Sequence, residues 1–297
     1  MSKTDLPHRT DTITWDCEHK LASVSIASNI AGYREPVCFV NDSDDEKAVV
    51  EKMVTYLEIL AETANERQRE RYKDIFKKID VKREKDIEKH VKEFPLIYSS
   101  KVSSFYDQLE DDLESYIRDL PVIGYNSRRY DINLIRKHLF DCLEQCDDPI
   151  DYVIKRGNCY MCVTTMNLKF LDIMNYVGPG YSYSDYLRAY EVTDVGKSIW
   201  IHSRFDSLDV LKRTDFPAYK ELYNDIKGCN VSPEEYENCR KVWITHGFTT
   251  LRDLLIFYNN QDVAGFVTAV ERQMEFFRSK GLDVKSSISL PGWLSLS

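Results

Sequence analysis

A turn from strand to helix within residues 121–139, PVIGYNSRRYDINLIRKHL, constrains the fold more than any other stretch of the chain. The apolar run from Val122 to Tyr125 predicts a short buried strand that ends in a polar turn. Apolar residues then recur at helical spacing, as Ile132, Ile135 and Leu139. Asn126 therefore lies at the carboxyl end of a strand, where open α/β sheets place ligand-binding groups. Asp131 lies in the first helical turn, where the helix dipole favours a carboxylate, so we expect both side chains to face one cleft.

Further strands are predicted on both sides of this turn. Residues 13–15, 21–27 and 36–40 are alternating or β-branched runs, and residues 152–155 and 159–165 flank a Gly-Asn turn typical of a hairpin. Residues 168–173 form another apolar run. Together these patterns predict an α/β fold with a mixed sheet from residue 13 to residue 173, flanked by helices.

Two stretches predict helices outside this sheet. Residues 44–120 favour helices, and their portion 61–93 is dense in Glu, Lys and Arg with only a thin apolar stripe. This pattern predicts a projecting, solvated helical pair, and a protein-interaction hairpin is the alternative. A helical subregion is expected over residues 183–247, where Ser182 with Asp185 and Ser232 with Glu235 form capping boxes.

The last long helix is predicted over residues 251–280, with Thr250 and Asp253 at its start and Gly281 after its end. Tyr258 and Asp262 are four residues apart within it and share one face of the helix. Spacing alone leaves two interpretations of these acids. Asp131 is either a helix-start acid that only caps or part of a site, and Asp262 is either a surface acid beside an aromatic residue or part of the same site.

Near the N-terminus, Asp16 and Glu18 are two residues apart in an extended run. In a strand they point to the same face, which is the arrangement that holds one divalent cation. They are therefore candidate metal ligands. Four cysteines, Cys142, Cys146, Cys159 and Cys162, have zinc-ribbon-like spacing. Their helical and strand contexts favour buried thiols instead.

Composition restricts the functional classes. The net charge of -9 argues against a broad electrostatic grip on duplex DNA, although metal ions can supply positive charge in a narrow cleft. Residues 1–11 lack the apolar core of a signal peptide, and no apolar run has the length of a membrane span. Eight cysteines in a chain of 297 residues are typical of reduced thiols. We expect an intracellular protein, nuclear or cytoplasmic, with no membrane association.

Two motifs resemble those of a known family. N-x-x-x-[FY]-D at residues 126–131 and Y-x-x-x-D at residues 258–262 resemble the second and third exonuclease motifs of family B DNA polymerases. The flanking sequence is similar to the protein-primed branch of viruses and Maverick/Polinton-type transposons. The resemblance covers roughly residues 18–292 and implies a single ribonuclease H-like 3′–5′ exonuclease domain over residues 1–297. The family's polymerase motifs D-x-x-S-L-Y-P and Y-x-D-T-D do not occur, so DNA polymerisation is not expected from this chain.

The resemblance also implies roles for individual residues. Asp131 and Asp262 would bind metal and act in catalysis, and Tyr258 would orient the attacking water. Asn126, Ser182 and Tyr186 would contact single-stranded DNA, although Tyr183 replaces a leucine of the family's motif. Either Asp16 and Glu18 form the first exonuclease motif, or this motif is missing from the chain.

The implied cofactors are two Mg²⁺ or Mn²⁺ ions, which would assist phosphodiester hydrolysis. The implied partners are the 3′ end of single-stranded DNA and either a polymerase domain or a terminal protein primer. Two alternatives remain. One is a decayed or domesticated fragment that binds single-stranded nucleic acid or a protein without cleaving. The other is a scaffold that uses residues 61–93.

Overall fold

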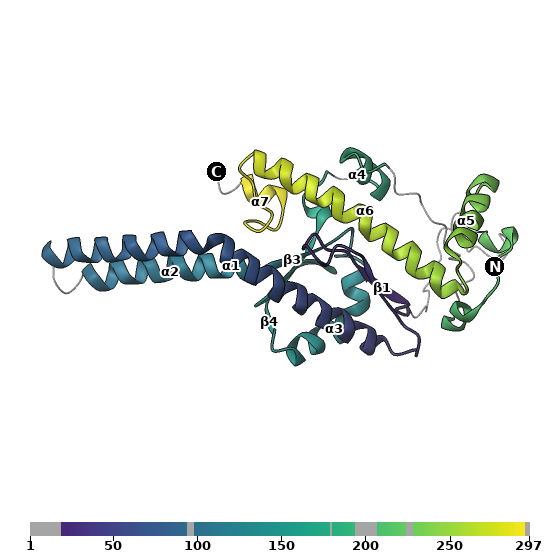
Figure 1. The fold of residues 1–297 in the computed structure, drawn as a ribbon, viewed down its shortest axis with the longest axis horizontal. Helices are drawn as coiled ribbons and strands as arrows, with labels where there is room; N and C mark the ends of the chain where they lie inside the picture. Colours follow the sequence, from purple (N-terminus) through teal and green to yellow (C-terminus); the bar gives the residue numbers. More distant parts are fainter. Residues whose placement is uncertain (1–18, 94–97, 179, 194–206, 224–227, 295–297) are drawn as a thin grey trace, which may run out of the picture.

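The computed structural model describes residues 19–93, 98–178, 180–193, 207–223 and 228–294. It confirms the α/β class: strands occupy the centre of the molecule, helices lie on both sides of them, and one helical pair projects far outward (Figure 1). No helix within these residues is long and apolar enough to cross a bilayer.

Within the described residues the strands form two sheets instead of the single sheet expected from the sequence. The strand expected at residues 13–15 lies outside the described residues. The smaller is an antiparallel pair, β1 (Ser23–Ile26) and β2 (Val37–Val40). The larger has the order β3-β6-β5-β4 and comprises β3 (Leu120–Gly124), β4 (Ile150–Arg156), β5 (Cys159–Thr165) and β6 (Leu168–Asp172). Its β3–β6 pair is parallel and its other pairs are antiparallel, so this sheet is mixed as predicted. The smaller sheet lies against the long C-terminal helix, whose Asn259 and Asn260 hydrogen-bond Ser23 and Ser25.

The strand-to-helix turn is confirmed. Strand β3 ends at Gly124, and helix α3 (Asp131–Gln145) begins at Asp131. The buried face of α3 consists of Ile132, Ile135, Leu139, Cys142 and Leu143. These residues join one core cluster with the start of α1 and with strands β5 and β6, which fixes α3 beneath the sheet.

The projecting pair consists of α1 (Glu46–Glu93) and α2 (Tyr98–Arg118). The first half of α1 buries Val50, Val54, Leu57 and Leu60 in the core. We call the outer part, residues 62–89 of α1 and 101–115 of α2, the arm. It extends away from the sheets (Figure 1), so the predicted projecting helical pair is confirmed.

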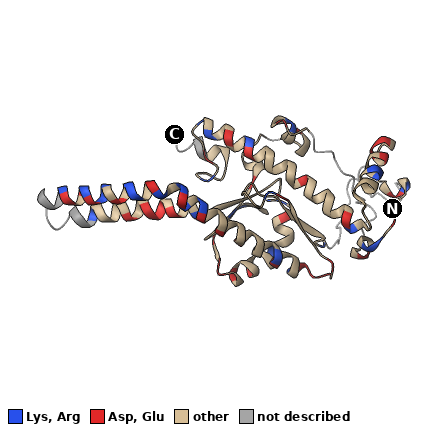
Figure 2. Ribbon diagram, in the orientation of Figure 1, with Lys and Arg blue, Asp and Glu red and all other residues tan. Residues whose placement is uncertain are grey.

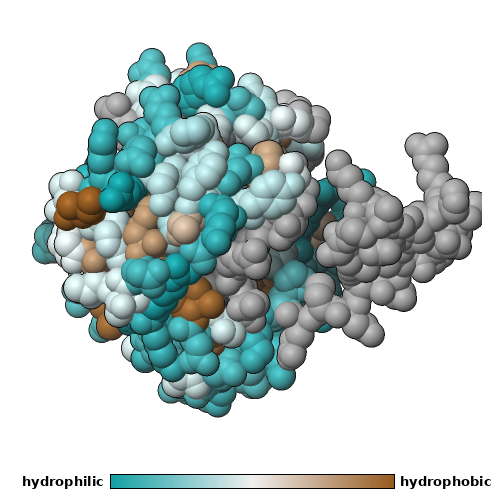
Figure 3. All heavy atoms as spheres, turned by 90° about the vertical axis from the view of Figure 1, so that its right-hand side faces the viewer, coloured by the Kyte–Doolittle hydropathy of each residue, from teal (hydrophilic) through white to brown (hydrophobic). Residues whose placement is uncertain are grey.

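The elements described after β6 are all helical. They are α4 (Tyr183–Ala189), α5 (Pro233–His246), α6 (Leu251–Ser279), α7 (Leu290–Leu294) and three short 3₁₀ helices (Ile173–Asn175, Leu208–Lys212 and Tyr219–Leu222). The three predicted capping boxes, at Ser182, Ser232 and Thr250, are all present. Helix α5 ends at Gly247 with φ 64°, a left-handed conformation that glycine adopts without strain. At the end of the molecule that carries α5, the surface is mainly hydrophilic with small separate apolar groups (Figure 3).

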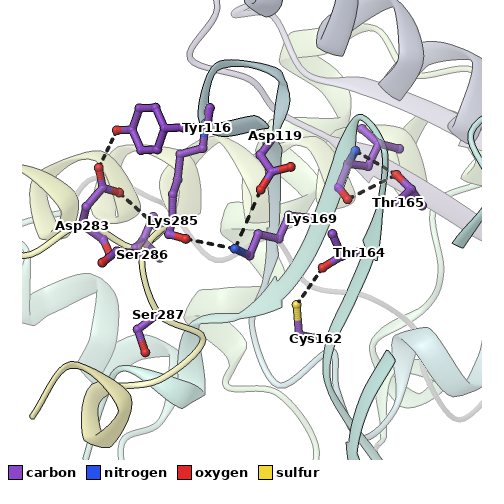
Figure 4. A network of polar contacts seen from close by, with 12 residues as sticks. Tyr116, Asp119, Cys162, Thr164, Thr165, Lys169, Asp283, Lys285, Ser286 and Ser287 are labelled. Atoms are coloured by element: carbon purple, nitrogen blue, oxygen red, sulfur yellow. Dashed lines mark hydrogen bonds and ion pairs between the residues drawn. The ribbon is translucent and has the colours of Figure 1, made fainter. Parts of the chain in front are cut away.

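A polar network holds the segment after α6 against the base of α2 and the start of β6 (Figure 4). The Tyr116 hydroxyl donates to Asp283 at 2.6 Å, and the Lys169 ammonium donates to the Lys285 carbonyl at 3.0 Å. The Lys285 ammonium lies 4.3 Å from the centre of the Tyr116 ring. Partial burial lowers the pKa of Lys285 to about 8, against the opposing effect of Asp119. The network ties the segment after α6 to α2 and β6.

Two carboxyl groups meet where α1 contacts the sheet. Asp148 is fully buried, and its carboxylate accepts hydrogen bonds from the Thr165 hydroxyl and from the Asn167 backbone N–H. Glu58 of α1 accepts a hydrogen bond from the Asn167 amide at 3.1 Å, while its Oε1 is buried without a hydrogen-bond partner. Burial and then the charge of Asp148 raise the pKa of Glu58 to about 7.

From the raised pKa of Glu58 we predict that the stability of the fold depends on pH. Because the folded-state pKa of Glu58 exceeds its ordinary value of 4.5, proton binding stabilises the fold fully below pH 4.5, and this stabilisation is lost as pH rises through 7. After allowance for solvent screening, we expect the free energy of unfolding to lose about 1 to 2 kcal/mol over this rise in pH. Glu58→Gln should remove that loss and be more stable than the wild type at pH 8. Urea unfolding at pH 5 and pH 8 measures it, with the exposed Glu51→Gln as control. Equal pH dependence in wild type and Glu58→Gln would refute the assignment.

Candidate functional site

The turn after β3 has a tightly restricted backbone. Asn126 is exposed and has φ 57°, a left-handed conformation that asparagine tolerates better than most residues. A Cβ atom on Gly124 would lie 2.5 Å from the side chain of Ser127, so only glycine fits there. The Ser127 carbonyl accepts the Ile132 N–H at 3.1 Å. The turn therefore projects Asn126 outward and starts α3 at a fixed place.

Asp172, at the carboxyl end of β6, holds this turn. Its side chain is buried, and its carboxylate accepts the N–H of Asn126 at 3.1 Å, of Arg128 at 2.9 Å and of Met174 at 2.8 Å. Burial raises the pKa of Asp172, and these hydrogen bonds oppose the rise. The sequence interpretation missed this residue. The signal was present, since an acid closes the apolar strand LKFLD beside the turn.

Asp131 is the first residue of α3 and does not cap it. The N-cap residue is Tyr130, which makes no side-chain capping hydrogen bond. Within the described part of the chain, the Asp131 carboxylate makes no hydrogen bond or ion pair. Although the residue is exposed overall, crowding by protein atoms removes part of its solvation and raises its pKa, and the charge of Asp172 adds to the rise. Asp131 is thus an acid that lacks a positive partner among these residues.

The second predicted pair lies on α6. Tyr258 and Asp262 share one face of the helix, as the spacing predicts. Burial, then the charge of Asp262 and a hydrogen bond to it, raise the pKa of Tyr258 to about 12. Tyr258 is therefore a neutral hydroxyl at physiological pH, fixed beside a carboxylate.

Aromatic residues join the turn to α6. Tyr125, the residue before Asn126, packs edge-on against Tyr183 with ring centres 5.1 Å apart. The Tyr183 hydroxyl donates a hydrogen bond to the backbone carbonyl of Asp262. Both tyrosines also contact Phe266, one turn further along α6, with ring centres 6.4 Å and 6.1 Å away. The structure thus connects the two motif-bearing segments through one cluster of aromatic rings.

The pKa values of Tyr125 and Tyr183 are affected by nearby acidic groups. Burial raises the pKa of Tyr125, and the charge of Asp172 contributes to the rise. Burial likewise raises the pKa of Tyr183, with the charge of Asp262 as the next cause. The pKa of Tyr125 therefore responds to Asp172 beside the turn, and the pKa of Tyr183 responds to Asp262 on α6. Arg128, whose Nε lies 3.8 Å from the Asp172 carboxylate, offsets part of the negative charge beside the turn.

Two predicted DNA-contacting residues make hydrogen bonds within the protein. Tyr186 is fully buried, and its hydroxyl donates to Gln273 of α6 at 2.7 Å, so its ring is not accessible to a base. Ser182 accepts the Asp185 N–H and donates to the Asp185 carboxylate at 2.6 Å, as the cap of α4. Tyr181, beside them, is 48% exposed. An exposed aromatic ring is therefore present one residue before Ser182.

The remaining candidate ligands are only partly described. Asp16 and Glu18 lie outside the described residues. Within those residues, no group of three or more His, Cys, Asp or Glu side chains could hold a metal ion, which applies also to the four cysteines of the ribbon-like spacing. Asp131 and Asp262 nonetheless supply oxygen ligands of the kind that Mg²⁺ and Mn²⁺ prefer.

Comparison of the chain with protein-family models, with curated proteins and with solved structures finds no match.

Proposed function

We propose that the chain is a ribonuclease H-like domain of the family B polymerase type that hydrolyses single-stranded DNA from its 3′ end with the help of divalent cations. The motif resemblance is one support for this proposal. The other is the architecture. A mixed sheet carries residues 126–131 at the end of a strand, and a long helix carries residues 258–262.

The observation that carries the proposal is the connection between the two motifs. Residues 126–131 and 258–262 are far apart in the sequence, yet Tyr125 and Tyr183 link them through one ring contact and one hydrogen bond. Tyr125 directly precedes the motif at residues 126–131, and Tyr183 hydrogen-bonds the backbone of Asp262, so both motif-bearing segments contact one aromatic cluster. Asp131 also carries a raised pKa and no positive partner in the described residues, which is typical of a functional acid.

The proposed roles follow from this geometry. Asp131 and Asp262 would hold the cations, together with Asp16 and Glu18 if these belong to the site. Bound divalent cations neutralise charge on the attacking and leaving oxygens of a phosphodiester. Tyr258, whose hydroxyl donates to Asp262, would accept a hydrogen bond from the attacking water molecule and so orient it. Asn126 projects from the turn towards the bound single-stranded DNA, and the exposed ring of Tyr181 is available for base stacking.

The test is an end-labelled nuclease assay on the purified wild-type chain. A single-stranded oligonucleotide with a 3′ label should release labelled mononucleotides in Mg²⁺ or Mn²⁺, and chelation should stop the release. A 5′-labelled strand should shorten progressively from the other end, which identifies the polarity. Retention of full-length strands at every metal concentration would overturn the proposal.

A second candidate function is binding of single-stranded DNA without cleavage. It is favoured by the finding that the described residues contain no three-ligand metal group. The same oligonucleotide in a gel-shift experiment separates the two functions. A strand that is shifted and stays intact in Mn²⁺ identifies a binding protein.

A further inference from the structure

Two positively charged side chains converge on one tyrosine of the larger sheet. Tyr160 of β5 pairs with Lys155 of β4, so both side chains lie on the same face of the sheet. The Lys155 ammonium lies 4.4 Å from the centre of the Tyr160 ring. Arg136 of α3 donates a hydrogen bond to the Tyr160 hydroxyl at 3.5 Å. This hydrogen bond is the largest cause of a lowered pKa at Tyr160, and Lys155 adds to it against the effect of burial.

Asn133 joins two further segments at this place. Its side-chain amide donates to the backbone carbonyl of Arg129 at 3.1 Å and to that of Asn158 at 3.0 Å. Because one nitrogen contacts both carbonyls, the turn before α3 lies directly against the tip of the β4–β5 hairpin. Arg156 ends β4 at this tip. The side chains of Arg129 and Arg156 are thus carried by two adjoining segments, and both residues are exposed.

Four exposed cations therefore lie where the turn, α3 and the hairpin meet. We call them the basic patch, which consists of Arg129, Arg136, Lys155 and Arg156. Within the described part of the chain, none of the four forms an ion pair. On the arm, by contrast, positive and negative residues alternate (Figure 2), and Lys77, Lys82 and Arg83 each pair with an acid of the arm. The patch is a local surplus of positive charge on a chain whose net charge is -9.

The acids of the neighbouring segments do not neutralise this patch. Asp131 begins the same helix as Arg136, but a separation of five residues places the two side chains about 140° apart around the helix. Asp172 is buried, and its carboxylate accepts three backbone N–H groups. Asp151 lies near the opposite end of β4 from Lys155, about 13 Å away along the strand, which exceeds the Debye length at physiological salt. The positive charge of the patch is therefore available to an external anion.

An exposed aromatic ring lies in the same turn. Tyr130 follows Arg129 and is 51% exposed. Its hydroxyl lies 3.1 Å from His19 Nδ1, within hydrogen-bonding distance, which restrains the ring. Proteins that bind single-stranded nucleic acid combine cations that follow the backbone with aromatic rings on which bases stack. The turn and the patch supply both kinds of group.

We propose that the basic patch binds the backbone phosphates of single-stranded DNA. This inference rests on the proposed function for the choice of the strand, and it adds the surface that holds the strand beside the turn carrying Asp131. Arginine and lysine form charge-assisted hydrogen bonds with phosphate oxygens. An acidic peptide is a poorer occupant, because its carboxylates are carried on flexible side chains that must be ordered on binding. Duplex DNA is also poorer, because the negative charge of the rest of the chain opposes a broad contact.

Fluorescence anisotropy of a labelled oligothymidylate on the full chain tests the proposal. EDTA is present, so that binding is measured without hydrolysis. In Arg136→Gln with Lys155→Gln, the dissociation constant should rise roughly 20-fold. The slope of log affinity against log salt concentration should become less negative by about 1.4, since each phosphate contact on a single strand contributes about 0.7.

A second variant protects the test against a folding defect. Arg129→Gln with Arg156→Gln should weaken binding to the same extent, and neither side chain makes a hydrogen bond within the described residues. The matched control is Lys101→Gln with Lys241→Gln, which removes the same charge from exposed positions of α2 and α5. The control should bind like the wild type, and circular dichroism should show the same helix content in all variants.

Three results overturn the proposal. They are a wild type that does not bind the strand, patch variants with unchanged affinity and salt slope, and displacement of the strand by polyglutamate as effectively as by unlabelled oligothymidylate. Failure of the nuclease proposal is distinguishable from these results. Binding through the patch without hydrolysis in Mg²⁺ contradicts the nuclease and keeps the patch, whereas hydrolysis by a chain whose patch variants bind normally contradicts only the patch.

Discussion

Replacing Asp131 or Asp262 with asparagine is expected to lower the rate of nucleotide release by roughly 1000-fold, about 4 kcal/mol in transition-state stabilisation. Asparagine keeps the size of the side chain and removes the negative charge that holds a divalent cation. If the two acids serve one site, the double variant should be no slower than either single variant, because groups that act as a unit are not additive. The measurement is single-turnover hydrolysis of a 3′-labelled single strand.

The stability of the Asp131 variant provides an independent readout. Loss of solvation and the charge of Asp172 raise the pKa of Asp131, so its carboxylate opposes folding at neutral pH. Asp131→Asn should therefore melt at or slightly above the wild-type temperature while activity is lost. Asp141→Asn, an exposed acid on the same helix, is the control and should change neither quantity. Full activity in Asp131→Asn would exclude it from catalysis.

The local elements of the candidate site were predictable from the sequence. The turn and α3 follow from an apolar run, a polar turn and helical spacing, and α6 follows from its cap at Thr250 and from Gly281 beyond its end. Each of these signals acts within a few residues. For the same reason, the shared face of Tyr258 and Asp262 was predicted correctly.

Features that depend on distant partners were not predictable. Tyr186 follows an exposed capping motif, and its burial becomes evident only when Gln273 of α6 is placed opposite it. Asp172 resembles any acid at a strand end until the parallel pairing of β3 with β6 brings it to the turn. Strand β1 likewise pairs only with β2 among the described strands, and its contact with Asn259 and Asn260 of α6 is not evident from its own sequence. Spacing within a segment specifies its conformation, but not the element that covers it.

Asp172→Ala is expected to have the largest effect on stability, a loss of about 3 to 5 kcal/mol. The carboxylate is 1% exposed and accepts three backbone N–H groups, from Asn126, Arg128 and Met174. Alanine leaves all three donors without their partner in a buried place. For a chain of this size the melting temperature should fall by about 10 °C, as differential scanning calorimetry would measure. Activity should fall with it, because the turn that positions Asp131 is no longer held.

Asp172→Asn separates the hydrogen bonds from the charge. The amide retains one acceptor oxygen and removes a buried charge whose pKa is raised by burial, so we expect a smaller loss of about 1 to 2 kcal/mol. Asp209→Ala, which removes an 80% exposed carboxylate paired with Lys212, should stay within about 0.5 kcal/mol of the wild type. If the melting temperature of Asp172→Ala is as close to the wild-type value as that of Asp209→Ala, Asp172 does not hold the turn. The position of Asp131 must then have another cause.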